Sequence, residues 1–290
     1  MTTLAFITNA MSRIDPTRTL SLRNAFAREM RMRFRLLGTS IRKAVIEDDF
    51  LSLKVDAIGA GRRTGEKVNS FMTWLQEQLD SIILDADLAR PWTNRYVMLA
   101  YQRGILRGRQ ELINHGYRVP TVDSMGGIVP VSSNPFHQDR LGLLYTRTYN
   151  DLKGIAATMS QQISRVLSQS MTEGLDRKAI ARLLYRTIAG PVSGLGLTNT
   201  LGRFVPAKLR AEVLARTEVV RAHHVATSQE YRNWDVEGVT VMAEWVTAGD
   251  DRVCDECQPM EGKVFTLDEI EGMIPMHPRC RCVALPIDAS

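Results

Sequence analysis

The first 253 residues of this 290-residue chain contain no cysteine, and no apolar run approaches the roughly 20 residues that a membrane-spanning helix needs. A short apolar stretch at residues 1–10 has no basic residue before it, which argues against a secretory signal peptide. We therefore expect synthesis in a cytoplasm, where thiols stay reduced, and no membrane partner. The sequence also contains no nucleophile elbow, no glycine-rich phosphate-binding loop and no set of carboxylates spaced for catalysis. These absences favour a protein that is not an enzyme.

The charge of the chain is only mildly unbalanced. It has 37 basic and 32 acidic residues, and the resulting net charge of +5 favours acidic partners such as nucleic acid, although many proteins without such partners are equally basic. Apolar residues make up 44% of the chain, which is ordinary for a folded soluble protein. The length allows two domains, or one domain with an appendage.

All four cysteines lie within the last 37 residues, in two tight pairs, and a histidine precedes the second pair. The segments are Cys254-Asp-Glu-Cys257 and His277-Pro-Arg-Cys280-Arg-Cys282. Thiolates and imidazoles are the ligands of tetrahedral Zn²⁺, and two such turns about 20 residues apart are typical of a structural zinc site. In an extended segment Cys280 and Cys282 would point to the same side, so both could face one ion.

The ligand set stays open at this point, because five candidates compete for four positions. They are Cys254, Cys257, His277, Cys280 and Cys282. Four thiolates form the simplest set, and a set with His277 in place of Cys282 is the alternative; reduced unliganded thiols or a disulfide would leave no metal site. A zinc ion closed in by four protein ligands would fold this small region and would not catalyse a reaction.

Long amphipathic helices are predicted before this region. Asp15 and Pro16 indicate a helix start, with Asp15 as the cap and Pro16 in the first helical position, and apolar residues then recur at helical spacing as far as Val45. Further helices are expected at about 66–90, 92–114, 136–174, 176–190 and 206–234, and Asp176 is the expected cap of the helix at 176–190.

The apolar pattern changes from helical to alternating near the cysteines. The pattern is that of a strand, in which Val239, Val241, Ala243 and Trp245 alternate with Thr240, Met242, Glu244 and Val246. Short strands are also expected at 263–267 and 282–287. The expected fold class is mainly α: an elongated helical body with a small C-terminal α+β zinc-binding module. We expect four consecutive segments: an N-terminal Arg-rich helical region (1–113), a linker or loop (114–135), a central helical region (136–235) and the Cys/His module (236–290).

Basic side chains are dense on the first long helix. Candidate binding residues on it are Arg23, Arg28, Arg31, Arg35 and Arg42. Such a face could lie along DNA phosphates, could meet an acidic protein, or could simply be solvated.

Two other polar pairs are expected to be structural. His223 and His224 lie on a predicted helix without His-Glu-x-x-His spacing, which favours a surface or packing role. Asp250 and Asp251 follow a predicted strand, and we expect them to cap backbone amides of the turn that leads to the first cysteine pair.

Four segments in a fixed order resemble the phage Mu F-like minor head proteins, which are head morphogenesis proteins of tailed bacteriophages. The segments are Arg210–Glu218 (RAEVLARTE), Trp245–Cys257 (WVTAGDDRVCDEC), Gly262–Phe265 (GKVF) and His277–Cys282 (HPRCRC). The specific likeness covers about 206–287, and the region before it agrees only in being long, helical and rich in arginine.

The resemblance implies a non-enzymatic structural protein of the virion head that associates with the portal protein and assists head morphogenesis and DNA packaging or delivery. Major capsid protein, scaffolding protein and double-stranded DNA are further candidate partners, and synthesis would take place in the host bacterial cytoplasm. One alternative is a zinc-stabilised DNA-binding protein without a head role. Another is a zinc-supported His-Asn-His nuclease, but this needs a general-base histidine, and His277 is the sole histidine of the last 66 residues.

Overall fold

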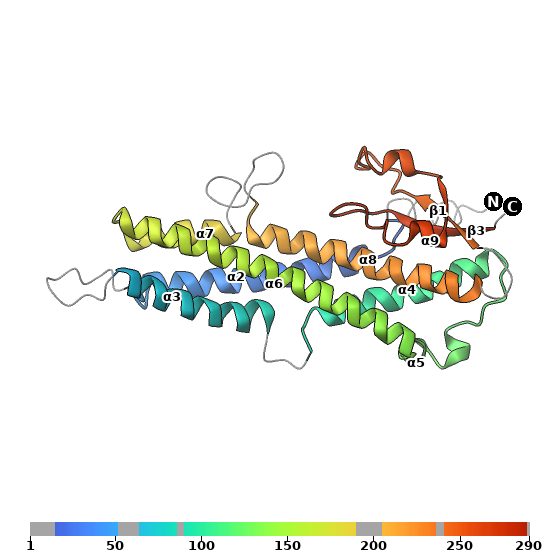
Figure 1. The fold of residues 1–290 in the computed structure, drawn as a ribbon, viewed down its shortest axis with the longest axis horizontal. Coiled ribbons are helices and arrows are strands. Elements are labelled where there is room, and N and C mark those ends of the chain that lie inside the picture. Colours follow the sequence, from blue (N-terminus) through green and yellow to red (C-terminus); the bar gives the residue numbers. More distant parts are fainter. Residues whose placement is uncertain (1–14, 52–63, 86–89, 190–204, 236–240, 289–290) are drawn as a thin grey trace. The chain divides into compact units, whose positions relative to one another are not determined.

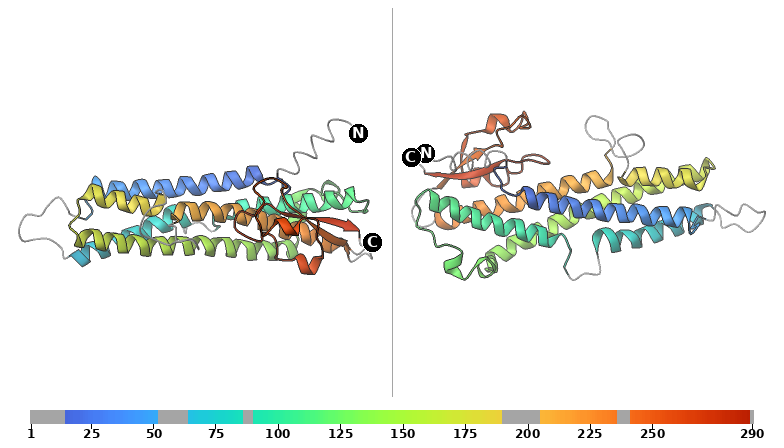
Figure 2. Two further views of the ribbon diagram at one scale, coloured as in Figure 1. Left: turned by 90° about the horizontal axis from the view of Figure 1, so that it is seen from above. Right: turned by 180° about the vertical axis from the view of Figure 1, so that it is seen from behind.

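The computed structural model describes residues 15–51, 64–85, 90–189, 205–235 and 241–288, and Figures 1 and 2 show its fold. Over these ranges the chain is mainly helical and ends in a small antiparallel sheet, which confirms the predicted fold class. None of the described helices combines the length and the apolar character needed to cross a bilayer.

The helices agree closely with the predicted ranges. They are α2 (Leu20–Ile46), α3 (Thr64–Gln78), the π-helix η1 (Leu79–Leu84), α4 (Asn94–Asn114), α5 (Ile128–Ser132), α6 (Pro135–Thr172), α7 (Arg177–Ala189), α8 (Ala207–Asp235) and the short α9 (Leu267–Ile270). Asp176 caps α7 as expected, because its carboxylate accepts hydrogen bonds from the amides of Lys178 at 2.7 Å and Ala179 at 3.0 Å.

The start of the first helix was predicted wrongly in one respect. Pro16 lies in a turn, and α2 begins four residues later at Leu20. Arg18 takes a left-handed conformation there, with φ of 52°, which breaks the helical path. Asp15 still acts as a cap, because its carboxylate accepts a hydrogen bond from the amide of Leu20 at 2.8 Å.

Residues 114–135 are more ordered than the predicted linker. They contain a 3₁₀ turn, η2 (Asp123–Met125), as well as α5, and Val122 and Val131 are buried. Gly126 and Gly127 both have positive φ, a conformation that glycine adopts without steric cost, and they turn the chain between the two elements. The two glycines therefore allow the turn, while the apolar residues attach the segment to the core.

Contacts divide the chain into two compact units. Unit 1 contains Met1–Phe26, Thr93–Arg147 and Ala215–Ser290, and unit 2 contains Ala27–Trp92 and Thr148–Leu214, with the described residues of each range. Three boundaries fall within α2, α6 and α8, and the fourth lies between Trp92 and Thr93 just before α4. Each unit therefore combines separate parts of the chain, unlike the four consecutive segments expected from the sequence. Of those segments, residues 1–14, 52–63, 86–89, 190–204, 236–240 and 289–290 lie outside the described ranges.

Unit 2 is packed around the apolar face of α2. The face consists of fully buried side chains: Met30, Phe34, Leu37, Ile41 and Val45. Arg33 links α2 to η1, because its guanidinium donates a hydrogen bond to the carbonyl of Ile82 at 2.8 Å. The same guanidinium lies 4.2 Å from the ring centre of Trp92, which is a cation–π contact. The helical spacing read from the sequence thus identifies the buried face correctly.

Unit 1 is held together by close helix packing and a buried polar network. Glu230 of α8 is fully buried and accepts a hydrogen bond from Arg109 of α4 at 2.7 Å. His137 of α6 lies 3.4 Å from the same carboxylate and 2.9 Å from the hydroxyl of Tyr101. A buried charge is tolerated only when it is paired, so this network fixes α4, α6 and α8 within the unit.

The sheet has the order β2-β1-β3 and is antiparallel throughout. Its strands are β1 (Val241–Val246), β2 (Val264–Thr266) and β3 (Val283–Asp288), each within a residue or two of its predicted range. Alternate residues of β1 are buried, and Trp245 is fully so. The core under the sheet includes Leu112 of α4 and Tyr231 of α8, so the cysteine-bearing region shares its core with helices of unit 1.

Candidate metal centre

Two tight turns of unit 1 present the candidate metal ligands. The first follows β1, where the amide of Cys257 donates to the carbonyl of Cys254 at 3.1 Å and to its sulfur at 3.4 Å. The second precedes β3, where the amide of Cys280 donates to the carbonyl of His277 at 3.1 Å. Cys282 then leads directly into β3. The sheet therefore brings together two turns that are about 20 residues apart in the sequence.

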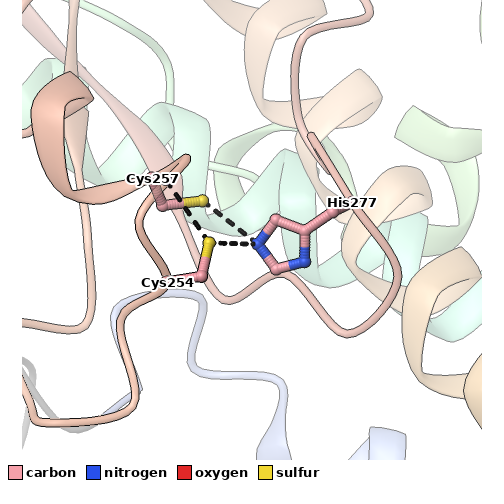
Figure 3. A group of neighbouring side chains, drawn as sticks. All are labelled: Cys254, Cys257 and His277. Carbon is pink, nitrogen blue, oxygen red and sulfur yellow. Dashed lines mark hydrogen bonds between the residues drawn. The ribbon is translucent and has the colours of Figure 1, made fainter. Parts of the chain in front are cut away.

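His277 faces the first cysteine pair, as Figure 3 shows. Its Nε2 lies 3.1 Å from the sulfur of Cys254 and 3.2 Å from the sulfur of Cys257. Its other ring nitrogen, Nδ1, lies 2.9 Å from the carbonyl oxygen of Pro278. Because a carbonyl only accepts hydrogen bonds, Nδ1 carries the proton, and the lone pair of Nε2 is directed at the two sulfurs. This is the tautomer that a metal-binding histidine needs.

Cys257 also belongs to a second group. Its sulfur and those of Cys280 and Cys282 all lie within 4.8 Å of one another, as do the ligand atoms of Cys254, Cys257 and His277. A zinc ion with Zn–S bonds of about 2.3 Å keeps its sulfurs about 3.8 Å apart, so both groups are close to the required spacing. All five predicted ligands are thus brought together by the fold.

A small cavity lies among these side chains. Its volume is about 30 Å³, and Cys254, Cys257, His277 and Cys282 are among the residues that line it. A space of this size holds one ion or one water molecule. The lining therefore favours a set in which His277 takes part and supplies the nitrogen ligand.

Burial and mutual contact shift the pKa values of the thiols in opposite directions. Burial raises the pKa of Cys257 to about 12, and the hydrogen bond with Cys280 raises the pKa of Cys282. The same hydrogen bond from Cys282 lowers the pKa of Cys280 to about 5. Ionisation is therefore favoured at Cys280 over Cys257 and Cys282. A divalent cation would favour the ionised form of all the thiols that it contacts.

An ion pair joins the two turns. The pKa of the Asp250 carboxyl is lowered, chiefly because Arg281 donates hydrogen bonds to both of its oxygens, at 2.6 and 2.7 Å. The same carboxylate accepts a hydrogen bond from the backbone amide of Arg252 at 3.1 Å, which confirms the capping role predicted for Asp250. The sequence did not reveal the pairing with Arg281, which only the folding of the two turns brings about.

The five arginines proposed as a binding face differ in accessibility. Arg23 is only 4% exposed and is paired with Asp15, so the prediction that it meets an external partner is wrong. Arg31 is half-buried and pairs with Glu212 at 3.1 Å. Arg28, Arg35 and Arg42 are exposed. The basic residues available to a partner on α2 are therefore fewer than the sequence indicates.

The two adjacent histidines of α8 have a packing role, as predicted. His223 and His224 are each 2% exposed. Burial, the main cause, lowers the pKa of both, to about 3 for His223 and about 4 for His224. They are consequently neutral at physiological pH and belong to the core of the unit.

A family model described as Phage Mu protein F like protein matches residues 161–285 of this chain. The matched range includes α7, α8, β1, β2, the start of β3 and all five candidate ligands. No curated protein and no solved structure matches the chain significantly.

Proposed function

We propose that this chain is a minor head protein of a tailed bacteriophage, because its residues 161–285 match the phage Mu F-like family of head morphogenesis proteins. The family match carries this proposal. It agrees with the four ordered segments found in the sequence, all of which lie within or overlap the matched range. The protein would be made in the host cytoplasm and incorporated into the virion head.

The portal protein is the proposed main partner, with the major capsid and scaffolding proteins as secondary ones. Support comes from the family resemblance, since the members of this family associate with the portal. In the test, the tagged portal protein of the same phage is co-expressed with this chain and purified. Retention of the chain through a wash at about 0.5 M salt is expected for an interface with an apolar core, whereas purely electrostatic contacts are screened. Recovery no higher than with an unrelated tagged protein would count against the partnership.

The proposed cofactor is a structural Zn²⁺, held by four of Cys254, Cys257, His277, Cys280 and Cys282. The fixed tautomer of His277 and the predominance of sulfur support zinc over magnesium or calcium, which prefer oxygen ligands. A bound Zn²⁺ would supply folding energy by linking the two turns. Elemental analysis of the purified full chain should give one zinc per chain. A zinc content near zero after purification without chelators would contradict this assignment.

The proposed role requires no turnover. Four protein ligands leave no open position for a reactive water, and His277, which a nuclease would need as a base, faces the cysteine sulfurs. Incubation of the full chain with plasmid DNA and Mg²⁺ should leave the DNA intact. Cleavage that is lost in His277→Ala but not in His115→Ala, a substitution at an exposed position, would favour the nuclease instead.

A further inference from the structure

A basic groove lies within unit 2, between α2 and α7. Its volume is about 560 Å³, and its lining includes Arg42 of α2 together with Lys178, Arg182 and Tyr185 of α7. The two helices lie side by side (Figure 2). Among the described residues that line the groove, three are cations and none is an acid.

Specific contacts fix the distance between the two helices. The ring of Tyr185 packs on Gly38, where a side chain would meet ring atoms at 3.1 Å, so glycine is needed for this close approach. At the end of α2, the guanidinium of Arg177 donates to the carbonyl of Ile46 at 2.9 Å. Terminal helix carbonyls have no partner within their own helix, so this bond satisfies one of them and ties α7 to α2. These two contacts therefore hold the walls of the groove at a fixed separation.

The cations along α7 are regularly spaced. Lys178, Arg182 and Arg186 recur every four residues, all three are exposed, and α7 has no acidic residue. Four residues of helix advance by about 6 Å, and side chains at this spacing lie on one face. On α2, Arg35 and Arg42 are two turns apart and exposed. The two helices thus present cations at fixed positions.

We propose that this groove binds the phosphate backbone of double-stranded DNA. The three cations of the lining suit a polyanion with closely spaced charges, and Asp176 at the start of α7 is the acid that interacts with Lys178 and Arg182. The planar guanidinium groups of Arg42 and Arg182 can each contact two phosphate oxygens. In a stiff duplex the phosphates keep a fixed spacing, which suits cations that rigid helices hold at fixed positions. A single strand is bound mainly by stacking on several aromatic rings, and the lining offers one, Tyr185. This site goes beyond the proposed head role and does not depend on it.

The test compares two double variants of the full chain. Arg42→Glu with Arg182→Glu reverses two groove cations, and Lys153→Glu with Arg165→Glu makes the same change in charge at exposed positions of α6 in the same unit. Binding of a fluorescent duplex of about 20 base pairs is measured by anisotropy at several salt concentrations. We expect the groove variant to bind at least about tenfold more weakly, with a salt slope smaller by about 2, because each lost phosphate contact removes about one unit. The α6 variant should change affinity by less than about threefold.

Equal weakening in the two variants would overturn the proposal, because it would indicate non-specific attraction by net charge. Undetectable duplex binding by the unchanged protein at about 50 mM salt, or tighter binding of a single strand of equal length, would also overturn it. Thermal unfolding establishes that each variant is folded. Arg42→Gln with Arg182→Gln, a milder change, should give roughly half of the loss in log affinity if the charges act at this groove. Retention on the tagged portal protein is measured in parallel, so failure of this site is distinguishable from failure of the head role.

Discussion

Arg281 binds both carboxylate oxygens of Asp250, at 2.7 and 2.6 Å, across 31 residues of sequence. Asp250 stands just before the first cysteine turn, and Arg281 lies between Cys280 and Cys282. The planar guanidinium and the carboxylate make two parallel hydrogen bonds, a geometry that also fixes orientation. This pair therefore aligns the two segments that carry the candidate ligands.

Loss of this pair should weaken metal binding. We expect Asp250→Asn to lower zinc affinity by about 10- to 100-fold, which is typical when a group that orients metal ligands is removed. Competition with a chromophoric chelator measures the change. Asp251→Asn, at the exposed neighbouring position, is the control and should leave the affinity within about twofold of the unchanged protein. Indistinguishable affinities for the two variants would mean that Asp250 does not support the site.

Removal of one thiolate should disrupt the region around the sheet. In Cys254→Ser the zinc content should fall below one per chain, and the near-ultraviolet circular dichroism of buried Trp245 should decrease, because the site closes the core beneath that residue. Far-ultraviolet circular dichroism should show that most helix remains. Treatment of the unchanged protein with a chelator should give the same spectra, and added zinc should reverse them. Unaltered near-ultraviolet spectra and zinc content in the variant would contradict a structural metal.

The buried histidines of α8 should make the protein less stable as the pH falls. The pKa values of His223 and His224 in the folded protein are about 3 and about 4, whereas an unfolded histidine titrates near 6.5. Below about pH 6.5 the unfolded chain binds protons that the folded protein excludes. The free energy of unfolding should therefore decrease by up to about 1.4 kcal/mol per pH unit for each histidine, down to about pH 4.

Urea unfolding at pH 7, 6 and 5 checks this dependence. His223→Gln with His224→Gln should flatten the decrease even if the variant is less stable throughout, because the slope depends only on the difference in bound protons. His115→Gln, at an exposed position, should keep the slope of the unchanged protein. The same slope in all three proteins would show that other groups cause the acid sensitivity.

Close packing of α4 on α8 should make Gly104 hard to replace. A Cβ atom at this position would lie 2.4 Å from the carbonyl oxygen of His223 and 2.7 Å from the Cβ of Ala226. Gly104→Ala should therefore lower the free energy of unfolding by about 1–3 kcal/mol, as helix backbones move apart. Gly142→Ala, in α6 of the same unit with no atom within 4 Å, should raise it by about 0.5–1 kcal/mol. Thermal unfolding of both variants distinguishes a packing effect from helix propensity.

Local patterns in the sequence predict the elements well. Helical spacing from Leu22 to Val45 identifies the buried face of α2, Asp176 identifies the cap of α7, and the alternation around Ala243 identifies β1. The cysteine and histidine spacing also predicts which residues gather at the candidate metal site. These features depend on periods of a few residues, which the sequence displays directly.

Local sequence patterns do not predict which residues pair between distant segments. Arg23 is buried and pairs with Asp15, and Arg281 pairs with Asp250, 31 residues away in the sequence. Lys178 and Arg182 belong to no recognisable sequence motif. Only the structure shows that they line the same groove as Arg42. Charge along one helix cannot indicate which side chains a neighbouring helix will cover, because that depends on tertiary packing.

The most direct measurement for the proposed head role is quantitative mass spectrometry of this chain in purified virions and in empty procapsids. A minor head protein associated with the portal should occur in a few copies per particle in both, at a constant ratio to the portal protein. Absence from both particles would contradict the account.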